Sequence, residues 1–247
     1  MPMSDRAGMV IQERDRHLLR ELAALRIIDR EQAKLIGQFG STTRVNRRLL
    51  MLHRAGLVKR YFLGTNGAGQ KAVYGISRKG ALLVDAPYRG LQRRSDEPII
   101  ADLFVQHQLA INDVYCSLRY LPMPVPGVQF LRWVHFFRPI VPEIRLIPDG
   151  YVEFVLNGNI ISCFLEIDRG PETLKTWTEK VRNYLQLALT GTFERLFQKP
   201  SFRVLVLANS ERRMLSIRKA VLPLTAKLFW FATLYEARGS GFFEPIW

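Results

Sequence analysis

The chain has 247 residues and a net charge of +14, and hydrophobic residues make up 48% of it. That hydrophobic share can fill the core of one large domain or two modest ones, which excludes wholesale disorder. Its two cysteines lie in apolar runs without disulfide or zinc-site spacing, and no apolar run reaches the roughly 20 residues of a membrane span, so we expect a cytoplasmic protein with no membrane partner.

The positive charge is concentrated in the first part of the chain. Residues 1–94 contain nineteen Lys/Arg and seven Asp/Glu, a net charge of +12, and residues 32–84 contain ten basic residues and no acidic one. A field of one sign confined to one segment usually faces a polyanion. A generally basic solvated surface is the simpler explanation, but the order of elements in this segment favours nucleic acid.

Three helices are predicted in this basic segment. Apolar residues at helical spacing predict the first helix within residues 11–28, and Asp29 is suited to cap the second. Ser41 can cap the third helix, which ends at Gly56. The buried stripe of this third helix is predicted to consist of Val45, Leu49 and Leu52.

Two β-rich arms follow, on either side of the Gly-rich turn NGAG at residues 66–69. Three helices and a basic hairpin follow one another in this order in a winged helix-turn-helix, whose third helix enters the major groove while the wing touches phosphates. The candidate DNA-binding residues are the polar and basic ones of the third helix and the hairpin: Ser41, Thr42, Thr43, Arg44, Asn46, Arg47, Arg48, Lys59, Arg60 and Lys71. Which of them read bases is left open.

A domain boundary is predicted in residues 85–98, which hold Pro, Gly and mixed charges without a sustained apolar period. We therefore expect a DNA-binding domain over residues 1–90 and an α/β domain over residues 91–247. The second domain should begin with a helix over residues 99–120 and a strand over residues 127–137.

The dipeptide Asn157-Gly158 between two apolar runs predicts a β-hairpin. If these two residues form the turn, Leu156 pairs with Asn159, and Asp149 falls directly opposite Glu166. Opposed residues point to the same face of a sheet, and so does Asp168, two positions further on. The register therefore brings three carboxylates to one edge of one sheet face.

Three close carboxylates would raise one another's pKa unless a cation lay among them. Their hard oxygen ligands suit Mg²⁺ or Mn²⁺, so a metal site formed by Asp149, Glu166 and Asp168 is expected. The alternative is that Asp149 belongs to a Pro-Asp-Gly turn, Asp168 caps the next helix and Glu166 pairs with an arginine.

The rest of the chain alternates between helix and strand. A helix is predicted over residues 171–189, a buried strand over residues 202–209 and a further helix over residues 211–222. The first of these helices should turn Leu174, Trp177, Val181, Leu185 and Leu189 inward. The tryptophans and phenylalanines lie at core spacing, so no platform for stacking single-stranded nucleic acid is expected.

This order of elements resembles the restriction-endonuclease-like, or PD-(D/E)XK, nuclease fold. The whole layout is similar to the replication-relaxation family of plasmids and other mobile elements, through the motifs HQLAIND (107–113), PDG (148–150), LEIDRG (165–170) and KVRNYL (180–185). The resemblance implies an α/β protein: an N-terminal winged helix-turn-helix followed by a restriction-endonuclease-like mixed sheet flanked by helices.

The resemblance also implies roles for the acidic residues. Asp149 matches the nuclease aspartate and Glu166 the first acid of the motif, but Asp168 occupies the place of the motif lysine. Some nucleases of this kind supply the lysine from the following helix, and Lys180 is the best candidate here, followed by Lys175. The alternative is that both are ordinary solvated lysines.

Two functions follow from this resemblance. The first is a sequence-directed double-stranded DNA-binding protein of a mobile element, which acts in replication or transcription control. The second is a Mg²⁺-dependent DNA endonuclease targeted by its winged helix, in which Asp149, Glu166, Asp168 and Lys180 would be catalytic. A homodimer and complexes with other mobile-element proteins are left open.

Overall fold

The computed structural model describes residues 9–64, 70–91, 98–100, 103–123, 125–170, 172–238, 242–243 and 246–247. Contacts between residues group the chain into two compact units, Met1–Cys116 and Ser117–Trp247. Within the described ranges, no helix is long and apolar enough to cross a membrane.

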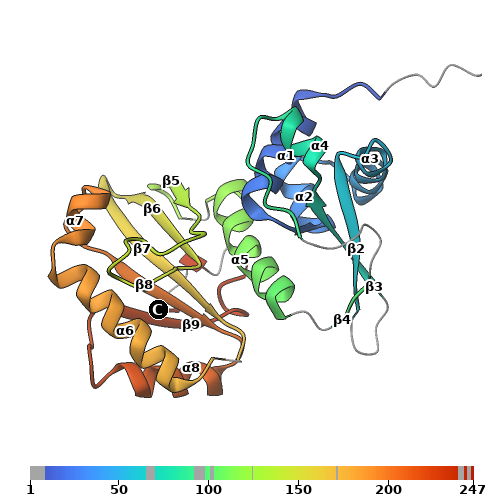
Figure 1. The fold of residues 1–247 in the computed structure, drawn as a ribbon. Helices are drawn as coiled ribbons and strands as arrows, with labels where there is room; N and C mark the ends of the chain where they lie inside the picture. The colour runs from blue at the N-terminus through green and yellow to red at the C-terminus, as the bar shows by residue number, and fades with distance from the viewer. Residues whose placement is uncertain are drawn as a thin grey trace, which may run out of the picture. The chain divides into compact units, whose positions relative to one another are not determined.

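The first unit combines helices with a small sheet (Figure 1). Its elements are α1 (Glu13–Leu25), β1 (Ile28–Asp29), α2 (Arg30–Ile36), α3 (Thr42–Arg54), β2 (Val58–Gly64), β3 (Gln70–Ile76), α4 (Arg78–Leu83), β4 (Pro98–Ile100) and α5 (Leu103–Tyr120). The strand order is β1-β3-β2-β4. β3 runs antiparallel to β1 and β2, and β4 joins β2 in parallel.

The predicted ends of the helices are confirmed. The Asp29 side chain accepts a hydrogen bond from the backbone N–H of Gln32 at 2.9 Å and caps α2. Ser41 accepts from the backbone N–H of Arg44 at 3.3 Å and caps α3, and Gly56 follows that helix with a φ of 72°. The stripe of α3 that is fully buried is the predicted one: Val45, Leu49 and Leu52.

One predicted helix starts later than expected. Residues 98–100 form β4 instead of the first turn of a helix, and α5 begins at Leu103. The pairing of β4 with β2 satisfies backbone groups that an open strand edge would leave unpaired, and this long-range gain outweighs the local helical pattern. The predicted turn at residues 66–69 lies outside the described residues.

The long helix α5 belongs largely to the first unit. The buried Asn112 amide donates to the carbonyl oxygens of Leu25 at 3.2 Å and Ile27 at 2.6 Å. The Gln32 amide donates to the carbonyl oxygen of Leu109 at 2.9 Å. The motif HQLAIND therefore binds α5 to the helices before it, while the division into residues 1–90 and 91–247 stays a prediction.

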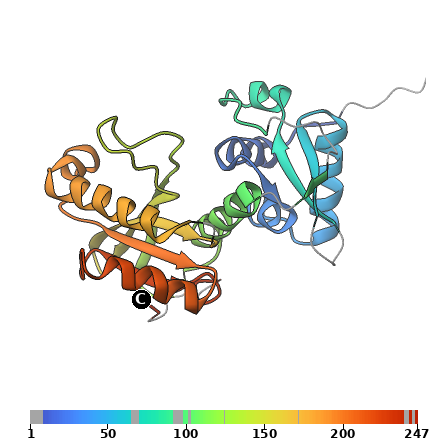
Figure 2. The ribbon, with the colours of Figure 1, turned by 60° about the horizontal axis from the view of Figure 1, so that its bottom comes forward.

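The second unit is a five-stranded sheet with helices on one face (Figure 1). Its elements are β5 (Val128–Val134), β6 (Gly150–Leu156), β7 (Asn159–Asp168), α6 (Leu174–Leu189), α7 (Thr192–Phe197), β8 (Arg203–Ala208), α8 (Glu211–Val221) and β9 (Phe229–Thr233). The strands follow one another in the order of the sequence: β5, β6 and β7 are antiparallel, and β7, β8 and β9 are parallel. Figure 2 shows α6 and α8 side by side against the sheet.

The hairpin between β6 and β7 has the predicted register. Asn157 and Gly158 both have positive φ, 49° and 80°, as a type I′ turn requires. Leu156 pairs with Asn159, and the ladder continues without a shift to Gly150 and Leu165. This confirmed register positions the acidic residues at the open end of the hairpin.

The inward face of α6 differs from the predicted one. Trp177 and Val181 are fully buried as expected, but Leu174 is half-exposed and Leu189 is 83% exposed. The buried stripe continues through Tyr184 and Leu187 instead, and it packs against the aromatic core of the sheet. The Tyr184 hydroxyl can be buried because it donates to Glu166 at 2.6 Å. α7 and β9 were not predicted.

Candidate nucleic-acid interface and carboxylate cluster

The outward face of α3 is polar and basic. Thr43, Arg44, Asn46 and Arg47 are exposed, opposite the buried stripe, and the neighbouring Ser41 and Thr42 are partly exposed. The first turn of α3 holds no acidic residue. This face can therefore approach a polyanion without charge repulsion, and four of its side chains are available to a ligand.

Arg48 has a different role from its neighbours. Its Nε donates to Asp15 Oδ1 at 2.7 Å, a second nitrogen donates to Asp15 Oδ2, and the same nitrogen reaches the carbonyl oxygen of Val10 at 2.7 Å. Asp15 is fully buried in α1. These hydrogen bonds raise the pKa of Arg48. The guanidinium group therefore fastens α3 to α1, which leaves it poorly placed to contact DNA.

The hairpin residues are partly engaged within the protein. The Lys71 ammonium lies 2.5 Å from Asp29 Oδ2, and the Arg60 guanidinium lies 4.9 Å from the centre of the Phe62 ring. Lys59 and Arg60 are partly exposed along β2, and half of the Lys71 side chain is exposed. Lys59 and Arg60 can present positive charge outward, whereas Lys71 is drawn toward the buried Asp29 and is only half available.

Glu166 lies at the centre of a buried network between β7 and α6. Lys180 Nζ donates to its Oε2 at 2.8 Å, and the Tyr184 hydroxyl donates to its Oε1 at 2.6 Å. Lys180 also donates to Glu172 Oε1 at 2.8 Å. The structure thus brings Lys180, one of the two lysines singled out on α6, directly to Glu166, whereas Lys175 is exposed.

Asp149 reaches the same edge from the start of β6. Its backbone N–H donates to the carbonyl oxygen of Leu165 at 3.1 Å, and its Oδ2 accepts from the backbone N–H of Ile167 at 2.7 Å. These two bonds hold Asp149 opposite Glu166, where its charge raises the pKa of that carboxyl. The two acids are neighbours, as the hairpin register requires.

Asp168 is held by a separate set of donors. Arg213 Nε donates to its Oδ1 at 2.8 Å, Arg213 Nη2 to its Oδ2 at 2.7 Å, and Trp177 Nε1 to its Oδ2 at 2.7 Å. The backbone N–H of Gly170 adds a fourth bond at 2.8 Å. Asp168 therefore ties the end of β7 to α6 and α8 by a bidentate ion pair.

The ionisation of Glu166 and Lys180 follows from their burial. Desolvation raises the pKa of Glu166 to about 7, although the Lys180 charge opposes the rise. Desolvation also lowers the pKa of Lys180, but the charges of Glu166, Glu172 and Asp149 outweigh it and raise this pKa above its usual value. Burial therefore favours the neutral form of Glu166, and the surrounding carboxylates favour the charged form of Lys180.

The pKa values of Asp168 and Tyr184 are also set by burial and by their hydrogen-bond partners. Burial opposes the ionisation of Asp168, but the hydrogen bonds from Arg213 and Trp177 hold its pKa below the usual range. Burial and the Glu166 charge raise the pKa of Tyr184, so its hydroxyl stays a hydrogen-bond donor. Asp168 is thus a permanent anion paired with a permanent cation.

These donors and acceptors do not fit a divalent ion in the arrangement observed. Both oxygens of Glu166 and both oxygens of Asp168 already accept hydrogen bonds from cations or buried donors. Across the described part of the chain, no three Asp, Glu, His or Cys side chains gather closely enough to hold a metal ion. An ion could bind only if Lys180, Tyr184 or Arg213 released its carboxylate.

The glycine of the PDG motif has a packing role. A Cβ atom on Gly150 would lie 2.2 Å from the Trp133 ring of β5, so the indole rests directly on the glycine backbone. Sequence reasoning missed Glu172 and Arg213. Nothing in the sequence around Glu172 indicates that it pairs with a lysine. Arg213 could have been found, because it lies in the first turn of the helix that follows a parallel strand.

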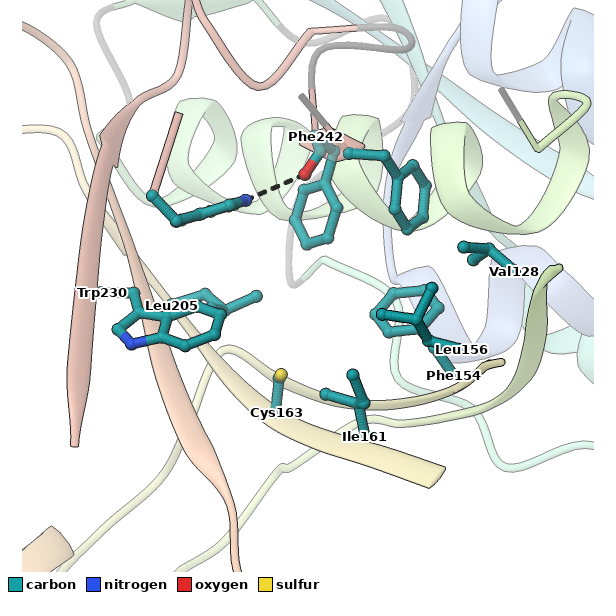
Figure 3. A pocket seen from close by; sticks show the side chains of 10 residues that line it. Val128, Phe154, Leu156, Ile161, Cys163, Leu205, Trp230 and Phe242 are labelled. Atoms are coloured by element: carbon teal, nitrogen blue, oxygen red, sulfur yellow. Dashed lines mark hydrogen bonds between the residues drawn. The ribbon is translucent and has the colours of Figure 1, made fainter. Parts of the chain in front are cut away.

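An apolar hollow lies beside the sheet of the second unit (Figure 3). It has a volume of about 170 Å³, and its lining is apolar: Val128, Phe154, Leu156, Ile161, Cys163, Leu205, Trp230, Phe242, Phe243 and Trp247. Burial raises the pKa of the Cys163 thiol to about 12, which keeps it protonated and unreactive. Among the described residues, the lining of this hollow offers almost no polar group to a phosphate or a nucleotide.

Comparison with known proteins gives one match. The model of the family described as replication-relaxation matches residues 16–199, a range that begins in α1 and ends after α7. No curated protein matches the chain, and no solved structure matches it.

Proposed function

The chain belongs to the replication-relaxation family, and we propose that it is a sequence-directed double-stranded DNA-binding protein of a mobile element. It would act in the control of replication or transcription. In this proposal the first unit is a winged helix-turn-helix, in which α3 enters the major groove and the β2–β3 hairpin is the wing.

The outward face of α3 carries this proposal. Thr43, Arg44, Asn46 and Arg47 are exposed on one side of a helix whose other side is fully buried. Arginine and asparagine are the side chains that form bidentate hydrogen bonds with guanine and adenine in the major groove. The charge of the segment around them supplies the phosphate attraction that such binding requires.

The full-length chain tests this proposal directly. Duplex binding measured by fluorescence anisotropy should weaken steeply with salt, with a log–log slope of roughly −4 to −5 for four to six phosphate contacts. Arg44→Ala should lower the affinity, while Arg20→Ala should not, because Arg20 is an exposed arginine paired with Glu13 on α1. A flat salt response would overturn the proposal.

The second unit, in this proposal, has a nuclease-like fold whose acidic site serves structure rather than chemistry. The ion pairs of Glu166 and Asp168 support this, since each carboxylate already has its cation. A second candidate function is a DNA endonuclease that uses Mg²⁺ or Mn²⁺ at Asp149 and Glu166. One observation favours it: an ammonium group, Lys180, lies 2.8 Å from Glu166, beside Asp149.

Incubation with supercoiled plasmid and Mg²⁺ or Mn²⁺ separates the two candidates. An endonuclease would nick or linearise the plasmid, and Asp149→Ala and Lys180→Ala would abolish that activity while Lys175→Ala would not. If the wild-type protein binds DNA and leaves the plasmid supercoiled with either ion, the second candidate is rejected.

A further inference from the structure

The end of the edge strand β5 and the three residues after it divide their apolar side chains between two faces. Val134 and Phe136 pack against the core that the sheet forms with α6 and α8. Because side chains alternate along an extended chain, Trp133, His135 and Phe137 point to the opposite side. The spacing in the sequence predicts core positions for these rings, but the alternation brings half of them to the surface.

The three outward side chains form a continuous row of rings. The ring centres of Trp133 and His135 are 6.0 Å apart, and those of His135 and Phe137 are 6.3 Å apart with an angle of 27° between the planes. Trp133 Nε1 also donates to His135 Nδ1 at 3.2 Å. Trp133 and His135 are partly exposed, and Phe137, at the end of the row, is 42% exposed.

Two cations lie in the loop between β5 and β6. Arg138 follows Phe137 directly, while the carbonyl oxygen of Arg145 accepts a hydrogen bond from Asn183 of α6 at 3.3 Å; both side chains are exposed. Among the described residues neither has a carboxylate partner, in contrast to Arg132, which pairs with Glu153 at 2.7 Å. Residues 127–142 contain no acidic residue, and the exposed Glu143 follows them. Partly exposed aromatic rings next to the unpaired Arg138 complement a ligand that has flat apolar faces and negative charge.

We propose that Trp133, His135, Phe137 and Arg138, here called the β5 ledge, bind the unpaired bases of single-stranded DNA. Every base has a π face that can stack on an aromatic side chain, and the backbone phosphates attract Arg138. This inference rests on the proposed function in so far as the ligand is DNA. It adds a second mode of binding, because α3 would bind a duplex and the β5 ledge a strand that has been opened.

The position of the ledge gives it a place in that process. Trp133 rests on Gly150, the first residue of β6, so the row of rings begins where β6 begins, on the sheet face away from α6. Strand separation is a step that any reaction copying a duplex requires, which connects the ledge with a replication-related family.

Phe137 offers the sharpest test, because it is exposed and its replacement should not unfold the protein. Binding of the full-length chain to a short fluorescein-labelled oligothymidylate is measured by anisotropy, beside a duplex of equal length. Phe137→Ala should weaken oligothymidylate binding roughly 5- to 150-fold, and Phe137→Tyr, which keeps the π face, should retain it. Arg138→Gln should reduce the log–log salt slope by about 0.7, the value of one single-strand phosphate contact.

Two matched variants complete the design. Trp230→Ala removes a 40% exposed ring from the other edge strand, β9, and should leave oligothymidylate binding unchanged. Arg47→Ala should weaken duplex binding alone. Equal losses for Phe137→Ala and Trp230→Ala would overturn the β5 ledge, and so would a change of oligomeric state in Phe137→Ala without a change in oligothymidylate affinity, since the surface would then be a protein contact. If the wild-type protein binds oligothymidylate but does not bind the duplex, the proposed function is overturned and the β5 ledge is not.

Discussion

Glu166 is a carboxyl group without solvent contact, and its environment decides how the protein responds to pH. Lys180 and Tyr184 satisfy both oxygens, yet burial raises its pKa to about 7, against about 4.3 in an unfolded chain. Between these two pH values the folded protein holds a proton that the unfolded chain has lost. The stability that Glu166 contributes is therefore complete below pH ~4.3 and disappears as the pH rises through about 7.

Glu166→Gln should remove this pH dependence. The wild-type free energy of unfolding should fall by about 3 kcal/mol relative to the variant between pH ~4.5 and pH ~8, because one pKa unit corresponds to about 1.4 kcal/mol. Urea unfolding at a series of pH values measures the difference. Glu179→Gln, an exposed change on α6, is the control. Parallel curves for the wild type and Glu166→Gln would show that Glu166 is ionised in the folded protein throughout.

At the scale of elements, two adjacent arginines of α3 differ in role: one forms a buried ion pair, and the other faces solvent. Arg48 holds buried Asp15, while Arg47 is exposed. Arg48→Ala should cost about 3–5 kcal/mol of stability, because it leaves a buried carboxylate without its cation. Arg47→Ala should change stability by less than about 0.5 kcal/mol and weaken binding to a preferred duplex by about 1–3 kcal/mol.

Urea unfolding and duplex titration of the two variants check this pair of expectations. Arg48→Ala combined with Asp15→Asn should recover part of the lost stability, since the unpaired charge is then gone. Equal losses of stability in Arg47→Ala and Arg48→Ala would contradict the division of roles.

Local signals predicted much of these elements. Asp29, Ser41 and Gly56 mark helix ends by side-chain and backbone properties that act within a few residues, and Asn157-Gly158 sets a register by its turn geometry. Partners that are far apart in the sequence could not be predicted from such local signals. Arg48 and Asp15 are 33 positions apart, and the start of β4 depends on an edge of β2 that exists only in the folded chain.

The same limit applies to the candidate site. The hairpin register brought Asp149 and Glu166 together, because pairing propagates regularly from the turn. The partner of Asp168 could not be predicted in this way, since Arg213 reaches it from a helix 45 positions later whose place depends on the parallel pairing of β7 and β8. Sequence spacing alone also gave no means of knowing that Glu166 and Asp168 each had a cation of their own.

On the scale of the whole molecule, α5 decides how much of the chain the first unit needs. A fragment of residues 1–90 lacks Val105 and Leu109 of the apolar cluster and the amide of Asn112. A fragment of residues 1–123 keeps them. Circular-dichroism melts should show a cooperative transition for the longer fragment and a lower, broader one for the shorter, because each buried acceptor left without its donor costs about 1–3 kcal/mol. Identical melts would show that the first unit is equally stable without α5.

The hydrogen bonds of Asn112 also bear on the order of events during synthesis. The carbonyl groups of Leu25 and Ile27, at the end of α1, receive a donor that is translated more than eighty residues later. Because domains fold as units while the ribosome is still adding residues, the nascent first unit has to wait for α5 to emerge from the exit tunnel before its packing is complete. Until then a basic and incompletely folded segment is open to nucleic acid and to proteases. We therefore expect pausing of translation within α5 to lower the yield of native protein more than pausing at a later point of the chain.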